Sequence, residues 1–315
     1  MSYSRIPSRS FNTLVYDHSR NQVTKRSTAT EKLRDEIRWY LQVPRPLHPF
    51  LPEIYDYSLE DELYVTMAWI RLPTVHQLYM EQAGAYRQME EVFQSMQDVI
   101  ACMSDYSTSE CVARVHLEDM YVRKTMRRLD RMRKQQEWVQ RIYMRGNVVL
   151  NGRSFPCPIR YLETHTNELD CLLDHSLPRI IHGDLCFPNL LYNGQQRRLV
   201  MIDPRGSFGN QSIYGDGRYD LAKVRHSLSG YDSIIADRFH VNLFGDELTI
   251  ELSQSREQAE WQIMWDEWCA SSLSEIRLIE ALLFLSMAAL HADHPGRQMA
   301  MYGLGTKLLY ETLGE

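Results

Sequence analysis

The stretch RIIHGDLCFPNLLYNG, residues 179–194, constrains the fold of this chain more than any other. It places His182, Gly183 and Asp184 in a row, and Asn189 follows the aspartate by five positions. The flanking isoleucines and leucines predict that this stretch is buried. A buried carboxylate or amide is costly unless it is hydrogen-bonded or serves a ligand. The polar side chains therefore either satisfy one another or form part of a binding site.

A second acidic motif, LVMIDPRGSFG, follows at residues 199–209. Its apolar residues predict a strand that ends at Asp203, because the next residue is a proline. The strand expected over NLLYNG pairs with it across a short turn. This hairpin is expected to bring Asn189 and Asp203 together.

This set of side chains suits the transfer of a phosphoryl group from a nucleotide to a hydroxyl. One carboxylate must orient the hydroxyl and accept its proton, and Asp184 is the candidate for this catalytic role. Mg²⁺ prefers oxygen ligands and takes only one or two protein carboxylates beside phosphate oxygens and waters. We therefore expect Asn189 and Asp203 to bind the Mg²⁺ that accompanies ATP.

The motifs HGDLCFPN and IDPRGSFG resemble the catalytic segment of the aminoglycoside phosphotransferase and choline kinase superfamily, which has a protein-kinase-like fold. The resemblance implies the same roles for Asp184, Asn189 and Asp203. It also implies that Asp220, in the motif YDLAK, braces the catalytic loop. We interpret His182 as a structural rather than a catalytic residue, and Asp220 is a candidate to hold its ring. The segments GDGRYDLAKVRHS and LHADHPGRQMAMYGLG are most similar to those of a bacterial branch of phosphotransferases that act in capsule or surface-polysaccharide biosynthesis.

The same resemblance implies a lysine on a small-lobe strand that binds the nucleotide phosphates and pairs with a helical carboxylate. Lys25 and Glu36 stand at these positions, and Glu31 is an alternative to Glu36. The glycine-rich phosphate loop of other kinases is missing, and PSRSFN stands in its place. Ser8 and Ser10 are therefore expected to contact phosphate.

The acceptor pocket is expected to involve residues near the end of the chain. The segment LHADHPGRQ follows an apolar helix, where a polar cluster must be paired or functional. His291, Asp293 and Arg297 are therefore candidate acceptor-binding residues, and the alternative is a helix-end network that only stabilises the fold. Arg205, in the second acidic motif, is a further candidate for contact with the phosphates or the acceptor.

Two other features have a structural interpretation beside a functional one. The basic segment VRKTMRRLDRMRK is either a solvated helix face or a surface where Lys124 or Arg128 steers an anionic acceptor. Cys186 lies two positions after Asp184, and we interpret it as a small buried thiol rather than a nucleophile.

The first seventy residues predict a small β-rich lobe. Strands are expected over 11–17, 22–25 and 62–70, with a helix over 30–43 between the second and the third. Thr30 is the expected N-cap of this helix, and the prolines after it are expected to end it. Its apolar positions are Leu33, Ile37, Tyr40 and Leu41.

The rest of the chain predicts a large, mainly helical lobe. Most of it after residue 219 is expected to be helical, and the other expected elements are helices over 74–103, 114–145 and 161–175, a hairpin over 147–156, and the strand pair that carries the catalytic motifs. The predicted fold class is therefore α+β, two-lobed and protein-kinase-like. Residues 1–70 form the expected nucleotide-binding lobe, and residues 71–315 form the helical lobe with the catalytic loop and acceptor site.

Composition limits the possible partners. The net charge is 35 − 41 = −6, which does not predict binding to nucleic acid. The six cysteines show no CxxC pair, so we expect reduced thiols. No apolar run is long enough to span a bilayer, and the polar start lacks the apolar core of a signal peptide. We therefore expect a cytoplasmic protein without a membrane span.

The sequence leaves several alternatives open. A metal-dependent hydrolase could use His182, Asp184 and Asp203 without Lys25, and it would bind metal without nucleotide. A non-catalytic nucleotide-binding regulator is disfavoured because the catalytic and metal positions are intact. A protein substrate is disfavoured because no APE-like segment follows Asp203. The small-molecule acceptor, the choice between ATP and GTP, and the oligomeric state stay open.

Overall fold

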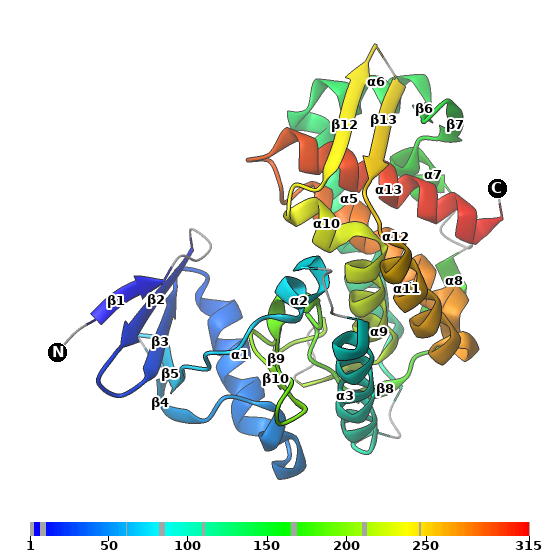
Figure 1. Ribbon diagram of the computed structural model, residues 1–315. Coiled ribbons are helices and arrows are strands. Elements are labelled where there is room, and N and C mark those ends of the chain that lie inside the picture. The colour runs from blue at the N-terminus through cyan, green and yellow to red at the C-terminus, as the bar shows by residue number, and fades with distance from the viewer. Residues whose placement is uncertain are drawn as a thin grey trace. The chain divides into compact units, whose positions relative to one another are not determined.

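The computed structural model describes residues 3–6, 11–60, 62–81, 86–108, 111–164, 169–209, 213–245 and 247–314 (Figure 1). The chain divides into two compact units. The first comprises Met1–Glu110 and Pro178–Gly217, and the second comprises Cys111–Leu177 and Arg218–Glu315. The N-terminal sheet and the two catalytic motifs therefore belong to the same unit. The predicted boundary at residue 70 separates a nucleotide-binding lobe from a catalytic lobe. This functional division stays a prediction.

A five-stranded antiparallel sheet begins the first unit, in the order β1-β2-β3-β5-β4. The strands are β1 (Tyr3–Ile6), β2 (Asn12–Asp17), β3 (Gln22–Ser27), β4 (Ile54–Ser58) and β5 (Tyr64–Ala68). The predicted strands correspond to β2, β3 and β5. The two edge strands were missed, because β1 is short and polar and β4 is mostly exposed, so neither has the apolar alternation of a half-buried strand.

Helix α1 (Thr30–Gln42) packs beside this sheet (Figure 1). Leu33, Ile37 and Tyr40 are buried as predicted, but Leu41 is 43% exposed and Trp39 is buried instead. The prediction of Thr30 as the N-cap was wrong, because the helix already begins at Thr30. Ala29, the residue before the helix, makes no side-chain cap. Its N–H group donates a hydrogen bond to the Ser27 hydroxyl.

The remainder of the first unit consists of one long helix, α3, and several short elements. These are η1 (Arg45–Phe50), α2 (Val75–Glu81), α3 (Tyr86–Ser104), β8 (Pro178–Ile180), η4 (Phe187–Asn189), β9 (Leu190–Asn193), β10 (Arg198–Met201) and β11 (Tyr214–Asp216). β8 pairs with β11 in an antiparallel two-stranded sheet. The single helix expected over 74–103 is therefore two helices, with residues between them that the structure does not describe.

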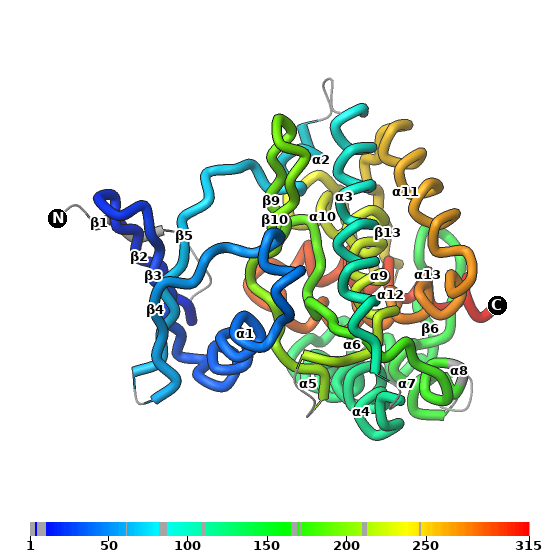
Figure 2. Tube along the Cα trace, turned by 90° about the horizontal axis from the view of Figure 1, so that it is seen from below, coloured from blue at the N-terminus to red at the C-terminus, as the bar shows by residue number. Residues whose placement is uncertain are grey.

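The predicted hairpin between the catalytic motifs is confirmed as β9 and β10. Leu190 pairs with Met201 at its open end, and the N–H of Ile202 donates to the carbonyl of Asn189 across 3.0 Å. Figures 1 and 2 show this hairpin beside α3. The hairpin fixes the ends of the two motifs next to each other.

The second unit is mainly helical. Its helical elements are α4 (Arg114–Glu118), the π-helical η2 (Asp119–Arg123), α5 (Lys124–Gln135), α6 (Glu137–Arg145), α7 (Pro158–Thr164), α8 (Asp170–Leu173), α9 (Arg218–His226), the π-helical η5 (Ser227–Tyr231), α10 (Asp232–Ile235), α11 (Arg256–Trp268), η6 (Ala270–Ser272), α12 (Leu273–Ala288) and α13 (Pro295–Leu313). Its strands are β6 (Asn147–Leu150), β7 (Arg153–Pro156), β12 (Phe239–Phe244) and β13 (Glu247–Leu252).

A four-stranded sheet of order β12-β13-β6-β7 corrects one expectation. The β6–β7 hairpin was predicted, but residues 239–244 and 247–252 form the paired strands β12 and β13 and not helix. Apolar residues alternate with polar ones along most of both strands, and this period of two suits a sheet with one covered face. Helix α13 packs against the sheet at Gly303, where a Cβ atom would lie 2.3 Å from Ile250 Cδ1 (Figure 1).

Helix α12 lies at the centre of the second unit and contacts α5, α9 and α13. Most of its residues are buried, which explains why its sequence is apolar on nearly every face. No helix among the described residues has the length and apolar character needed to cross a membrane.

Candidate active site

The HGD loop follows β8 and is organised by the ring of His182. The ring is fully buried; Nε2 lies 3.1 Å from the carbonyl of Ile202, and Nδ1 lies 3.3 Å from the backbone nitrogen of Asp184. Together these contacts assign the neutral tautomer, with Nε2–H as donor and Nδ1 as acceptor. Burial lowers the pKa of His182 to about 4, although the Asp184 and Asp203 charges act in the opposite direction. His182 therefore joins the two motifs as a neutral ring.

Gly183 is required by two features of this loop. Its φ of +76° lies in the left-handed region that favours glycine. A Cβ atom would also lie 2.7 Å from the Cβ of Arg205, whose backbone N–H donates to the carbonyl of His182 across 2.8 Å. The close approach of Arg205 to Gly183 brings the IDPRG segment against the HGD loop.

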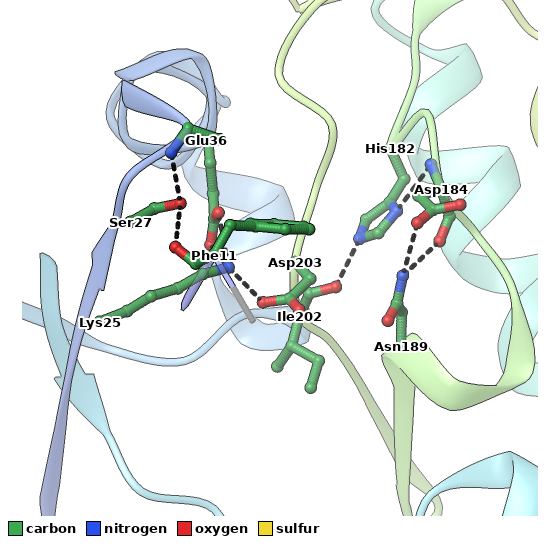
Figure 3. Close-up of polar contacts among 10 residues, drawn as sticks. Phe11, Lys25, Ser27, Glu36, His182, Asp184, Asn189, Ile202 and Asp203 are labelled. Atoms are coloured by element: carbon green, nitrogen blue, oxygen red, sulfur yellow. Dashed lines mark hydrogen bonds and ion pairs between the residues drawn. The ribbon is translucent and has the colours of Figure 1, made fainter. Parts of the chain in front are cut away.

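Asp184 and Asn189 are held by direct hydrogen bonds (Figure 3). The amide nitrogen of Asn189 donates to the backbone carbonyl of Asp184 across 2.9 Å and to its carboxylate across 3.2 Å. The amide oxygen of Asn189 points away from Asp184. The Asp184 carboxylate is therefore oriented by Asn189 and remains partly accessible.

Asp203 follows β10 in a backbone conformation that is uncommon for a residue with a side chain. Its φ is +57°, a value that costs on the order of 1–3 kcal/mol and is often found at functional sites. The side chain is 51% exposed, and one carboxylate oxygen lies 2.8 Å from the Nζ atom of Lys25. The conformation thus directs an accessible carboxylate toward a buried lysine (Figure 3).

Lys25 lies on β3 and forms an ion network with Glu36 and Asp203. Its ammonium contacts both carboxylate oxygens of Glu36, at 2.9 and 2.7 Å, so Glu36 and not Glu31 is its partner on α1. Burial alone would lower the pKa of Lys25, but the two neighbouring carboxylates raise it overall. Burial raises the pKa of Glu36, and the ammonium opposes that effect.

Helix α1 also supports the loop that follows Asp203. Gly206 has a φ of +76°, and a Cβ atom there would lie 2.2 Å from the backbone carbonyl of Asp35. Only glycine allows this approach of the loop to the helix. Neither this contact nor the role of Trp39, whose indole N–H donates to the carbonyl of Ile181, was predicted from the sequence. A tryptophan on a half-buried helix is indistinguishable from an ordinary core residue by its sequence.

The remaining candidate residues take no part in the contacts described above. Ser8 and Ser10 lie outside the described residues. Asp220 is buried in α9 of the second unit, and its support of the catalytic loop stays a prediction. Lys124 is buried in the second unit, with its ammonium 5.2 Å from the ring centre of Tyr219.

The candidate acceptor cluster lies around the start of α13. Arg297 binds both carboxylate oxygens of Asp237, at 2.8 and 2.7 Å, and donates to the carbonyl of Ile235. His291 and Asp293 lie in the short connection between α12 and α13. The Arg297–Asp237 pair is a helix-end contact that needs no ligand, and the acceptor-binding role of the cluster stays a prediction.

The ligand set fits Mg²⁺. Among the described residues no group of three or more His, Cys, Asp or Glu side chains could hold a metal ion. Asn189 and Asp203 offer one amide oxygen and one carboxylate, the sparse set that Mg²⁺ accepts when phosphate oxygens and waters complete its shell. The exposure of Asp203 leaves its carboxylate accessible to such a ligand.

Comparison with known families identifies the chain. Residues 14–247 match the model of the phosphotransferase enzyme family, which covers the Lys25–Glu36 pair and both catalytic motifs. The chain belongs to this family. It is therefore a phosphotransferase of a family of small-molecule kinases that act on hydroxyl groups, as the sequence predicted. No curated protein sequence matches the chain.

Solved structures confirm the predicted kinase-like α+β fold of this phosphotransferase. The ternary complex of aminoglycoside phosphotransferase APH(4)-Ia with ADP and hygromycin B is similar, with a TM-score of 0.59, 10% identity, and coverage of 99% of this chain and 94% of that one. ADP-bound APH(2″)-Ib has a TM-score of 0.51, 13% identity, and coverage of 98% and 92%. The streptomycin–ATP–APH(2″)-IIa complex has a TM-score of 0.51, 13% identity, and coverage of 100% and 92%.

Proposed function

We propose that this phosphotransferase is an Mg²⁺-dependent kinase that transfers the γ-phosphoryl group of ATP to a hydroxyl of a small sugar or polyol. The observation that carries the proposal is the ion network of Lys25, Glu36 and Asp203 in the same unit as the Asp184–Asn189 pair. A metal-dependent hydrolase has no need for a buried lysine between two carboxylates. The network supports a nucleotide-dependent reaction instead.

Asp184 is the proposed general base. Its carboxylate would accept the proton of the acceptor hydroxyl while the hydroxyl oxygen forms a bond to the γ-phosphorus. The bond between that phosphorus and the β–γ bridging oxygen would break, and ADP would leave. Asn189 would keep the carboxylate aimed at the hydroxyl through its amide N–H group.

Lys25 is the proposed phosphate-binding residue. An ammonium is a compact charge that can exchange one anionic partner for another, so phosphate oxygens could replace Asp203 while Glu36 keeps Lys25 in position. Asn189 and Asp203 would hold the metal, which when bound neutralises charge on the β- and γ-phosphates. Ser8 and Ser10, at the N-terminal end of the chain, are further proposed phosphate contacts.

The nucleotide and the acceptor are proposed on different grounds. Similar structures contain ADP or ATP, which supports an adenine nucleotide over GTP. The sugar or polyol acceptor, and a role in capsule or surface-polysaccharide biosynthesis, rest on the resemblance of the motifs. Arg205, His291, Asp293 and Arg297 are the proposed acceptor-binding residues.

A screen of small hydroxyl compounds tests the proposal. The enzyme is incubated with MgATP and each compound, ADP release is measured, and products are examined for the mass gain of one phosphate. Asp184→Asn should lower acceptor-dependent turnover by about 10²–10⁴-fold, the usual contribution of a general base, with little effect on ATP affinity. Asp174→Asn, which changes an exposed carboxylate bound to Arg114, is the matched control and should keep full turnover. Wild-type turnover in Asp184→Asn would refute this role of Asp184.

A further inference from the structure

Trp39 connects helix α1 to the HGD loop. The side chain is fully buried, and its indole N–H donates to the carbonyl of Ile181 across 2.7 Å. The same ring meets His182 edge to face, with ring centres 5.8 Å apart and planes at 74°. Trp39 therefore contacts Ile181, the residue before the HGD loop, through its N–H donor, and His182, the first residue of that loop, through its ring.

The contacts of Trp39 continue to the other parts of the site. His182 binds the carbonyl of Ile202, the residue before Asp203. Glu36 lies three residues before Trp39 on the same helix and binds Lys25. A single turn of α1 is thus linked to the phosphate lysine on one side and to the loops of the base and the metal ligand on the other.

We propose that Trp39 is a positioning residue that holds the catalytic loop in place relative to the Lys25–Glu36 pair. The inference rests on the proposed roles of Asp184 and Asp203. Trp39 itself contacts neither nucleotide nor acceptor and acts through Ile181 and His182. Loss of its donor lets the loop shift, which displaces the base from the acceptor hydroxyl. The contacts of Lys25 with Glu36 do not depend on the indole, so ATP binding is retained.

The test is Trp39→Phe, which keeps an aromatic ring and removes the N–H donor. A displacement of about 1 Å in a reacting group can cost about 10²-fold, so kcat should fall by about 10–100-fold. The KM for ATP, and the affinity for MgATP measured by calorimetry, should stay near the wild-type values. An unchanged kcat in the folded variant would overturn the proposal. So would a loss confined to ATP affinity, because Trp39 would then support the nucleotide site alone.

Trp265→Phe is the matched control. The Trp265 side chain is also buried, and its indole donates to the carbonyl of Leu221 across 3.3 Å, within the second unit. Leu221 lies inside α9, where the helix itself fixes the backbone, so this loss should lower the melting temperature and leave kcat unchanged. An equal fall in kcat for both variants would show that Trp39 acts only through stability.

Replacement of Trp39 by benzothienylalanine repeats the test with sulfur in place of the indole N–H and almost no change in volume. This analogue avoids the cavity that phenylalanine leaves, and it should also lower kcat at constant KM for ATP. Full activity of the analogue would contradict the proposal. Asp184→Asn separates this inference from the proposed function. If Asp184→Asn loses turnover and the two Trp39 variants do not, only the positioning role fails.

Discussion

Two ion clusters, one in each unit, place a cation between two carboxylates. In the first, Lys25 binds Glu36 and Asp203. In the second, Arg225 of α9 binds Asp266 of α11 and Glu280 of α12. The clusters differ in the exposure of their carboxylates. Asp203 is 51% exposed, whereas Glu280 is fully buried and Asp266 mostly so.

In the second cluster the cation is buried and fully paired. Arg225 contacts Asp266 through two nitrogens, at 2.8 and 3.0 Å, and it donates to Glu280 through a third. The Ser229 hydroxyl donates to the other oxygen of Glu280. Burial would lower the pKa of Arg225, but the two carboxylates raise it overall. A guanidinium held in this fixed geometry joins three helices and has no group left to exchange with a ligand.

The first cluster is open at one end. Lys25 and Glu36 are buried, while the carboxylate of Asp203 reaches solvent and stands on a strained backbone. A buried ion pair is therefore not evidence of function by itself. Function is indicated where one member stays accessible and the cation can exchange its partner.

The largest effect on stability is expected in the second cluster. Glu280→Ala should lower the free energy of unfolding by about 3–5 kcal/mol, because it leaves a buried guanidinium with only one carboxylate. Urea denaturation measures the loss, and the kcat of the fraction that stays folded should not change. Glu260→Ala, on α11, removes a carboxylate that is 38% exposed; it is the control and should have little effect. A stable Glu280→Ala variant with impaired catalysis would show that the second cluster serves catalysis and not stability.

The first unit should be the more sensitive to acid, through His182. Its pKa is lowered from 6.5 to about 4, so the unfolded chain binds a proton in a pH range where the folded chain does not. The contribution of His182 to the free energy of unfolding is fully present above pH 6.5. It is lost as the pH falls toward 4, and the loss is about 3 kcal/mol in total. Urea denaturation at several pH values measures it. His182→Asn should remove this part of the pH dependence. If the free energy of unfolding of this variant depends on pH as it does in the wild type, the ring is not buried in its neutral form.

A smaller effect is expected on nucleotide affinity. Lys25→Ala should weaken ATP binding by roughly 10–100-fold, as for the loss of a hydrogen bond to a charged group, and should leave adenosine binding almost unchanged. Calorimetry with both ligands measures the difference. Lys32→Ala, an exposed lysine on α1, is the control. Equal losses for ATP and adenosine would indicate a misfolded unit, and no loss would favour the hydrolase alternative.

The continuous motifs made much of the site predictable. Asp184 lies in the same continuous motif as Asn189, and Asn189 and Asp203 flank the open end of a hairpin of two apolar strands. Strand pairing across one turn is a local property of the sequence. The β9–β10 hairpin follows from that pattern. The pairing of Lys25 with Glu36 was inferred from family resemblance, because a strand lysine and a helical glutamate are by themselves unremarkable.

Contacts between distant segments could not be predicted in this way. The partner of Trp39 is a backbone carbonyl 142 residues away, and the approach of Gly206 to Asp35 depends on how the helix packs. Neither leaves a periodic signal. The β12–β13 hairpin is different. The alternation of apolar and polar residues along its strands is present in the sequence, but the neighbouring helical segments obscured this signal.

The most direct test of the comparison is the effect of Mg²⁺ on ATP affinity. Calorimetry is performed with Mg²⁺ and with EDTA on the wild type, Asp203→Ala and Glu280→Ala. We expect the wild type and Glu280→Ala to bind ATP more tightly with Mg²⁺, whereas Asp203→Ala should lose this gain because the proposed metal carboxylate is gone. An undiminished Mg²⁺ effect in Asp203→Ala, or its loss in a folded Glu280→Ala, would contradict the assignment of the open cluster as the functional one.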